Sequence, residues 1–449
     1  MTSRLKLPHP LALLVICLFI AAALSHILPA GQYARRHDLV TGRDVVVAGT
    51  FHAVPPAPVG FFQTLVAVPR GLEDAASVVF FVFLVGGAFA VVERTGALGR
   101  GVDWLVARLE DREALVIPVV CLAFATAGAL ENMQEEIIAL VPVLLLLTQQ
   151  LGFDALTAAA MSVGAAAVGS AFSPINPFQV GIAQKLAGLP LLSGATFRLS
   201  VMAPALALWI WGTLRHARRI RTAPAARRVA AEAPPFGWRA RGVLALVLAA
   251  FIAFVYGVLR LGWDFDQMSA LFFLMGVLAG LLGGLGVGGT SLAFVRGFEG
   301  MAYAGLLIGF ARAIYVVLDQ GLIIDTIVHG LFTPIGSLPL VLSAIGMTAV
   351  QAAIHIPVPS VSGQAVLTMP VLVPLSDLLG LSRQLTVLTY QIGAGLCELM
   401  TPTNGALMAV LAAAGVEYEN WLSFVTPLYA ALVGLGLAAV AIGIGIGWH

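Results

Sequence analysis

Charged residues are scarce in this chain. Only 10% of its 449 residues are Asp, Glu, Lys or Arg, and 59% are hydrophobic, whereas about a quarter of the residues in a soluble domain are charged. Apolar runs of about 18 residues or more, enough for a membrane-spanning helix, recur from Leu11 almost to the C-terminus. The sequence therefore predicts an all-α polytopic membrane protein and excludes a soluble enzyme, a disordered protein and a nucleic-acid binder.

The sequence also lacks the short motifs of several other protein classes. Its three cysteines are far apart, which indicates neither a disulfide framework nor a cysteine metal site: Cys17, Cys121 and Cys397. It contains no His-Glu-x-x-His metalloprotease motif and no phosphate-binding loop ending in Gly-Lys-Ser/Thr. We therefore expect no metal or organic cofactor and no direct coupling to ATP.

The basic residues predict the topology. The most basic segment, 215–241, holds eight arginines and three prolines, so we expect a cytoplasmic linker between two halves. Arg4 and Lys6 precede an apolar stretch that favours a retained first span over a cleaved signal peptide. The N-terminus is therefore predicted to be cytoplasmic, and nine crossings of a bacterial inner membrane would place His449 in the periplasm.

An internal repeat sets the predicted architecture. Arg70-Gly71-x-Glu73 recurs as Arg296-Gly297-x-Glu299, and Ser173-Pro174-x-Asn176 recurs as Thr401-Pro402-x-Asn404, at offsets of 226 and 228 residues. We therefore predict a first repeat over 1–214 and a second over 242–449. An extra span near 242–260 turns the second repeat over, and two inverted repeats are typical of secondary transporters.

Two matched segments, 114–150 and 339–378, differ from ordinary spans. Each has two apolar arms of about 15 residues, shorter than the roughly 20 that a straight span needs, around a polar centre near Glu131–Glu136 or Pro357–Gln364. We expect re-entrant hairpins with polar tips at membrane depth, because non-helical backbone is tolerated there when it lines a cavity. The alternative is two short spans joined by an exposed loop.

A second matched pair, 153–187 and 384–414, is predicted to form discontinuous helices. Prolines on both sides of Asn176, and Pro402 before Asn404, interrupt the helical hydrogen bonds. The freed carbonyls could coordinate a monovalent cation together with the side-chain oxygens, and the outgoing half-helix could hold a carboxylate. Those side chains are Ser173, Asn176, Thr401 and Asn404. The alternative is a pair of structural proline kinks.

Ionisable residues in these segments are costly to bury and therefore informative. Glu131, Glu135 and Glu136 lie at the first tip and would bind a cation or a substrate amino group, or simply be solvated. Glu398 lies one turn before Pro402. His355 is either a proton carrier or a hydrogen-bonded wall residue. Arg198 and Arg312 would pair with a carboxylate or extend toward the membrane surface.

Three stretches, 80–89, 176–184 and 400–407, together resemble the C4-dicarboxylate anaerobic carrier family, in its YfcC-like branch of the ion transporter superfamily. The resemblance implies two inverted repeats with a re-entrant hairpin and a discontinuous helix in each, elevator-type motion and often a homodimer. It places Asn176, Asn404 and the tips at 132–136 and 360–364 around substrate and ions. The Ser-Asn-Thr tips of better-known relatives are absent, so their sodium sites do not carry over.

We therefore expect an inner-membrane secondary transporter of a small carboxylate-bearing metabolite, either a C4-dicarboxylate or an amino acid. It would work by exchange or be coupled to Na⁺ or H⁺. An arginine/ornithine-like basic amino acid antiporter is the alternative, and a channel or a membrane-embedded enzyme is a further one. The predicted substrate and ion site comprises Asn132, Gln134, Glu135, Glu136, Ser173, Asn176, Ser360, Ser362, Gly363, Gln364, Glu398, Thr401, Thr403 and Asn404.

Overall fold

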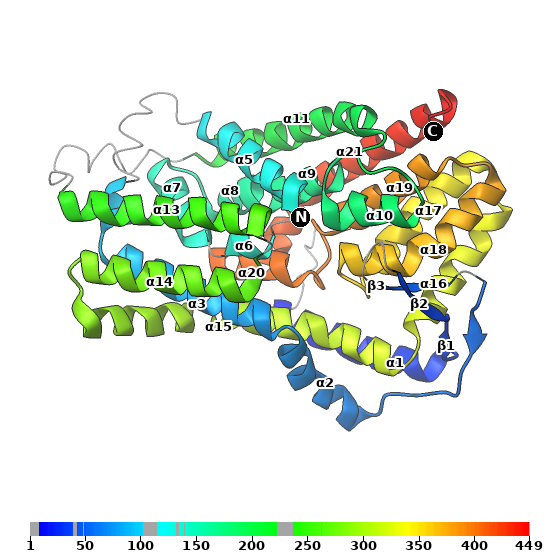
Figure 1. Ribbon diagram of the computed structural model, residues 1–449, viewed down its shortest axis with the longest axis horizontal. Coiled ribbons are helices and arrows are strands. Elements are labelled where there is room, and N and C mark those ends of the chain that lie inside the picture. Colours follow the sequence, from blue (N-terminus) through cyan, green and yellow to red (C-terminus); the bar gives the residue numbers. More distant parts are fainter. Residues whose placement is uncertain are drawn as a thin grey trace, which may run out of the picture.

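The computed structural model describes residues 9–38, 43–47, 49–101, 115–131, 134–138, 140–221, 237–261 and 263–448, and most of them are helical (Figure 1). Among these residues, six helices are long and apolar enough to cross a membrane, as expected for a polytopic helical protein. They are α3 (Ala76–Arg94), α11 (Ala195–Ile220), α14 (Phe265–Leu282), α15 (Gly286–Gln320), α18 (Val361–Leu379) and α21 (Tyr418–Gly445).

The segment after the first helix, α1 (Pro10–Ile27), adds to the helical fold short strands that the sequence did not predict. It forms two small antiparallel sheets, which pair β1 (Gly31–Gln32) with β4 (His52–Ala53) and β2 (Arg35–Asp38) with β3 (Arg43–Val46). The Asp325 carboxylate accepts a hydrogen bond from the Tyr33 backbone amide at 2.9 Å and pairs with Arg35 at 3.0 Å. This loop is therefore anchored to α16 (Ile324–Phe332).

The rest of the first half contains the expected interruptions. A short helix, α2 (Phe61–Asp74), precedes α3. The first hairpin segment comprises α5 (Val116–Glu131), α6 (Glu135–Ile138) and α7 (Val141–Gln150). The following helix is broken at 172–176, which contains Pro174, and Pro177 begins the helix after the break. It comprises α8 (Ala155–Ala159), η2 (Ala160–Gly164), α9 (Ala165–Ala171), η3 (Pro177–Gly181) and α10 (Ile182–Leu186).

The second half repeats this order of elements. After α13 (Trp238–Leu261), α14 and α15, the second hairpin segment comprises α17 (Leu340–His355) and α18, which follow α16 and η4 (Thr333–Ser337). The next helix is interrupted between η5 (Gln391–Gly395) and α20 (Gly405–Ala414), after α19 (Arg383–Tyr390). The linker expected at 215–241 is shorter than predicted, because α11 continues to Ile220 and α13 begins at Trp238.

Close helix packing brings the interrupted segments to the middle of the molecule. The helix α15 lies against α3, where a Cβ on Gly297 would come within 2.5 Å of the Gly87 Cα, so these backbones touch directly. In Figure 1, α16–α18 and the strands gather at the right, and the α14–α15 turn lies at the left. The short helices α6 and α20 lie side by side between these ends.

Candidate functional site

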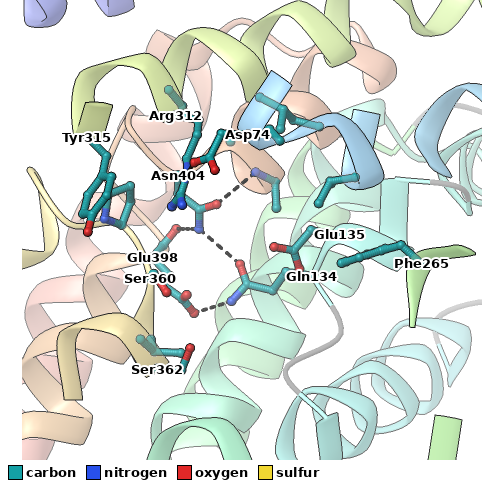
Figure 2. A pocket seen from close by; sticks show the side chains of 18 of the residues that line it. Asp74, Gln134, Glu135, Phe265, Arg312, Tyr315, Ser360, Ser362, Glu398 and Asn404 are labelled. Carbon is teal, nitrogen blue, oxygen red and sulfur yellow. Dashed lines mark hydrogen bonds and ion pairs between the residues drawn. The ribbon is translucent and has the colours of Figure 1, made fainter. Parts of the chain in front are cut away.

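A cavity of about 640 Å³ lies where both hairpin segments approach the second break (Figure 2). Its other walls are formed by the junction of α2 with α3, the helix α15, the start of α14, and Phe178 of η3 just after the first break. Its polar and charged lining residues, among those the structure describes, are Asp74, Gln134, Glu135, Asp264, Arg312, Tyr315, Ser360, Ser362, Glu398, Thr403 and Asn404.

Three of these side chains form one hydrogen-bonded group. The Gln134 amide donates to the Glu398 carboxylate. The Asn404 Nδ2 lies 3.2 Å from Gln134 Oε1 and 3.3 Å from the Glu398 carbonyl oxygen. All three residues are less than 10% exposed. Because burying a carboxylate is costly unless a partner or ligand compensates it, Glu398 marks the polar centre of the cavity.

Two helix N-termini also face the cavity. Asn404 Oδ1 caps α20 by accepting from the backbone amides of Ala406 at 3.0 Å and Leu407 at 3.2 Å. Ser360 caps α18 by accepting from the Gly363 amide at 3.2 Å. Helix N-termini carry partial positive charge and favour anions, so the second hairpin and the second broken helix each present an electropositive end to the cavity.

The charged lining residues are mostly acidic. The described lining contains four carboxylates, on Asp74, Glu135, Asp264 and Glu398, and one guanidinium, on Arg312. Arg312 already pairs with Asp74 and lies over the Tyr315 ring at 4.8 Å. The pair neutralises one carboxylate, so the remaining lining has a net negative character.

The structure brings only part of the predicted site to the cavity. Seven predicted residues line it: Gln134, Glu135, Ser360, Ser362, Glu398, Thr403 and Asn404. Ser173, Asn176, Gly363, Gln364, Thr401 and His355 are not among its lining residues. Asn132 and the side chains of Glu131 and Glu136 lie outside the described residues. Asp74, Asp264 and Tyr315 were missed, because acidic or aromatic residues at helix ends carry no distinctive spacing.

The first break is built from internal hydrogen bonds. Asn176 Oδ1 caps η3 by accepting from the amides of Phe178 and Gln179 at 2.9 Å, and Asn176 Nδ2 donates to the Gly128 carbonyl at 2.8 Å. Ser173 Oγ donates to the Ala129 carbonyl at 2.7 Å and accepts from two backbone amides of the break. Asn176 and Ser173 are fully buried. These contacts hold the break against α5.

His355 lies behind the second hairpin tip. Its Nδ1 is 2.8 Å from Gln364 Oε1, and the Gln364 amide donates to the Gln351 carbonyl at 2.7 Å. The side chain is fully buried, and its Nε2 has no hydrogen-bond partner among the described residues. Its role as a proton carrier stays a prediction.

Comparison with known sequences identifies related proteins. The profile of the C4-dicarboxylate anaerobic carrier (DcuC) family matches residues 7–445. The chain is 32% identical over 398 residues to the Escherichia coli K12 protein named "Putative basic amino acid antiporter YfcC", covering 84% of this chain and 79% of that protein. It is 28% identical over 413 residues to an uncharacterized Haemophilus influenzae protein, covering 88% and 81%.

Two solved structures are similar over nearly the whole chain. The Alcanivorax borkumensis YdaH transporter is 18% identical with a TM-score of 0.45, and the match covers 98% of this chain and 99% of that one. Neisseria gonorrhoeae MtrF, an antimetabolite efflux pump, is 17% identical with a TM-score of 0.42, covering 98% and 95%.

Proposed function

We propose that this chain, which belongs to the C4-dicarboxylate anaerobic carrier family, exchanges basic amino acids across the bacterial inner membrane. Membership of this family makes it a multi-pass membrane transporter and not an enzyme. The observation that carries this proposal is the net acidic lining of the central cavity. The family's name favours a dicarboxylate instead, and the binding experiment below separates the two substrates.

The acidic lining favours a substrate with positive charge. Glu135, Asp264 and Glu398 face the cavity without a basic partner among its described lining residues. A dicarboxylate would meet like charge from all three, which disfavours its binding. An α-ammonium together with a guanidinium or side-chain ammonium would instead compensate these carboxylates, and the E. coli relative bears the name of a basic amino acid antiporter.

The same cavity offers a place for the α-carboxylate. The N-termini of α18 and α20 face it from two sides, and backbone amides at such ends bind anions. A volume of about 640 Å³ is in the usual range for small-molecule sites. The acidic side chains therefore match the α-ammonium and the cationic side chain of a basic amino acid, and the helix N-termini match its α-carboxylate.

We further propose that the two halves are inverted repeats that alternate access by moving the hairpins and broken helices. The support is the matched element order, with α5–α7 corresponding to α17–α18 and α8–α10 to α19–α20 at nearly constant offset. If both hairpins are re-entrant, nine crossings place the N-terminus in the cytoplasm and the C-terminus in the periplasm. The cavity would then lie near the midplane, where such transporters bind substrate.

Reporter fusions test this topology. A reporter active only in the periplasm should be active after Trp448 and inactive after Ile220. Activity at both points, or an inactive C-terminal fusion, would contradict the inversion.

Ligand binding tests the substrate. Purified protein should melt at higher temperature with arginine, ornithine or lysine than with succinate, fumarate or neutral amino acids. A ligand at 100 times its Kd adds about 2.7 kcal/mol to the free energy of unfolding. Stabilisation by dicarboxylates alone would contradict the basic amino acid proposal and favour the substrate of the family's name.

Transport in proteoliposomes tests the exchange mechanism. Vesicles loaded with ornithine should take up labelled arginine rapidly, and empty vesicles should take up little. Equal uptake by empty vesicles under an imposed Na⁺ or H⁺ gradient would show ion-coupled symport in place of exchange.

A further inference from the structure

A buried arginine lies beside the first break. Arg198, on α11, is only 1% exposed. Its described hydrogen bonds go to neutral oxygens, namely Gln391 Oε1 at 2.7 Å, the Ser193 carbonyl at 2.9 Å, Gln384 Oε1 at 3.0 Å and the Gln384 carbonyl at 3.5 Å. The guanidinium also lies over the Trp448 ring at 5.2 Å. Burying a guanidinium against neutral groups is costly, which indicates that its positive charge has a use.

Gln391 connects this charge to the first break. Because arginine has only hydrogen-bond donors, the Gln391 carbonyl oxygen must face Arg198, and its amide nitrogen then points the other way. That nitrogen donates to the Ser173 carbonyl at 2.8 Å. Two hydrogen bonds in series therefore join a permanent cation to the backbone of the break.

The Ser173 carbonyl lies just beyond the C-terminal end of a half-helix. The helix α9 ends at Ala171, and the Phe172 and Ser173 amides turn back to the Val168 and Ser170 carbonyls. The carbonyls that follow Ala171 therefore lie outside the helical hydrogen bonds, at the end of the helix that carries partial negative charge. In broken-helix transporters, such carbonyls coordinate the coupling cation. Here the side-chain oxygens Asn176 Oδ1 and Ser173 Oγ already accept backbone amides.

We infer that Arg198 is a built-in cation of the first break, where its guanidinium, acting through Gln391, replaces a bound alkali ion. This inference concerns the first break alone and does not depend on which substrate the central cavity takes. The inference predicts a gain of function: a variant in which the charge of Arg198 is cancelled should bind a small alkali cation at the first break.

Gln391→Glu is the variant that tests the inference. It keeps the side-chain size and the contact with Arg198, but it adds a compensating negative charge and removes the donor to Ser173. The full-length protein is purified in detergent, and its Tm is measured without substrate in NaCl, LiCl and choline chloride at equal ionic strength. The wild type should give the same Tm in all three salts. The variant should melt lower in choline and recover several degrees in Na⁺ or Li⁺.

Two further variants are controls. Gln351→Glu is a matched change at another buried glutamine, whose amide donates to the Thr368 hydroxyl at 2.9 Å and neither to the break nor to a group that Arg198 contacts, so sodium should not rescue it. Arg198→Lys keeps the charge and should remain insensitive to the cation even if Gln391→Glu does not fold.

Three outcomes would overturn the inference. One is a Gln391→Glu protein with the same Tm in sodium and choline. Another is an Arg198→Lys protein that sodium stabilises selectively. The last is a wild-type protein stabilised by sodium, with the stabilisation lost in Ser173→Ala, because a cation would then already bind at the break.

Discussion

The two breaks share a motif but differ in what surrounds it. In each, an asparagine caps the outgoing helix with its side-chain oxygen, Asn176 on η3 and Asn404 on α20. The Asn176 amide then donates to the Gly128 carbonyl, which fixes it to the first hairpin backbone. The Asn404 amide instead lies next to the side chain of Gln134 and faces the cavity. We call the first break closed, because its asparagine amide is bound to backbone, and the second break open, because its asparagine amide faces the cavity. The same local fold therefore supports both kinds of break.

The residue one turn before each break accounts for much of this difference. Glu398 lies 228 residues after Ser170, at the offset that relates the two asparagines. Ser170 hydrogen-bonds to Gln179 and Asn176 inside the first break, whereas Glu398 meets Gln134 in the cavity wall. The asparagine cap is thus common to both breaks, whereas the neighbouring residue contacts the interior of the first break and the cavity wall at the second.

Neutralising Glu398 should have the largest effect. Glu398→Gln should weaken binding of a basic amino acid by about 2–4 kcal/mol, or roughly 30- to 900-fold, because the substrate loses a buried charged partner. Titration calorimetry with arginine measures the change. Ser170→Ala, at the matching position, should leave the affinity nearly unchanged.

Dicarboxylates give the opposite expectation for Glu398→Gln. Removing a negative charge should leave succinate binding the same or tighter. Unchanged affinity for every ligand would show that Glu398 is structural, and the two breaks would then be equivalent in function.

Replacing the asparagines should separate stability from binding. Asn404→Ala should lower ligand affinity by about 1–3 kcal/mol, or roughly 5- to 150-fold, because a polar cavity contact is lost. Asn176→Ala should instead lower the free energy of unfolding by a similar amount, since it removes a helix cap and the hydrogen bond to the Gly128 carbonyl. Binding measured beside thermal denaturation distinguishes them, and a large affinity loss in Asn176→Ala would place the first break in the site after all.

The breaks themselves could be read from the sequence, because prolines and the repeated Asn act through local backbone rules. The side chains that surround each break could not be predicted from the sequence, because they come from distant parts of the chain. The Gln134–Glu398 contact joins residues 264 positions apart, and the Arg198–Gln391 contact joins residues 193 positions apart. The sequence predicted that Arg198 would pair with a carboxylate or extend to the surface, but glutamines enclose it. Arg312 does pair with a carboxylate, on Asp74.

Close backbone contact at the first break gives the third prediction. A Cβ on Gly395 would lie 2.8 Å from the Ala171 Cα and closer still to the Gln179 amide nitrogen. Gly395→Ala should therefore destabilise the protein by about 1–3 kcal/mol through overpacking. Gly434→Ala on α21, with open space around its Cβ, is the matched control and should be neutral or slightly stabilising. Equal Tm values for both variants would show that the two broken helices do not pack tightly here.

The smallest effect should come from the hydroxyl at the open break. Thr401 Oγ1 lies 2.7 Å from Thr403 Oγ1, and Thr403 also donates to the Ile356 carbonyl at 2.7 Å. Thr401→Val keeps the shape and removes the bond to Thr403 Oγ1, which retains its bond to Ile356, and a long bond from the Thr403 amide at 3.4 Å. It should therefore cost only about 0.5–1.5 kcal/mol of stability. Ser173→Ala at the matching position should cost more, since that hydroxyl joins three backbone groups. Chemical denaturation of the two variants measures the difference, and a larger loss for Thr401→Val would reverse the assignment of the closed and open breaks.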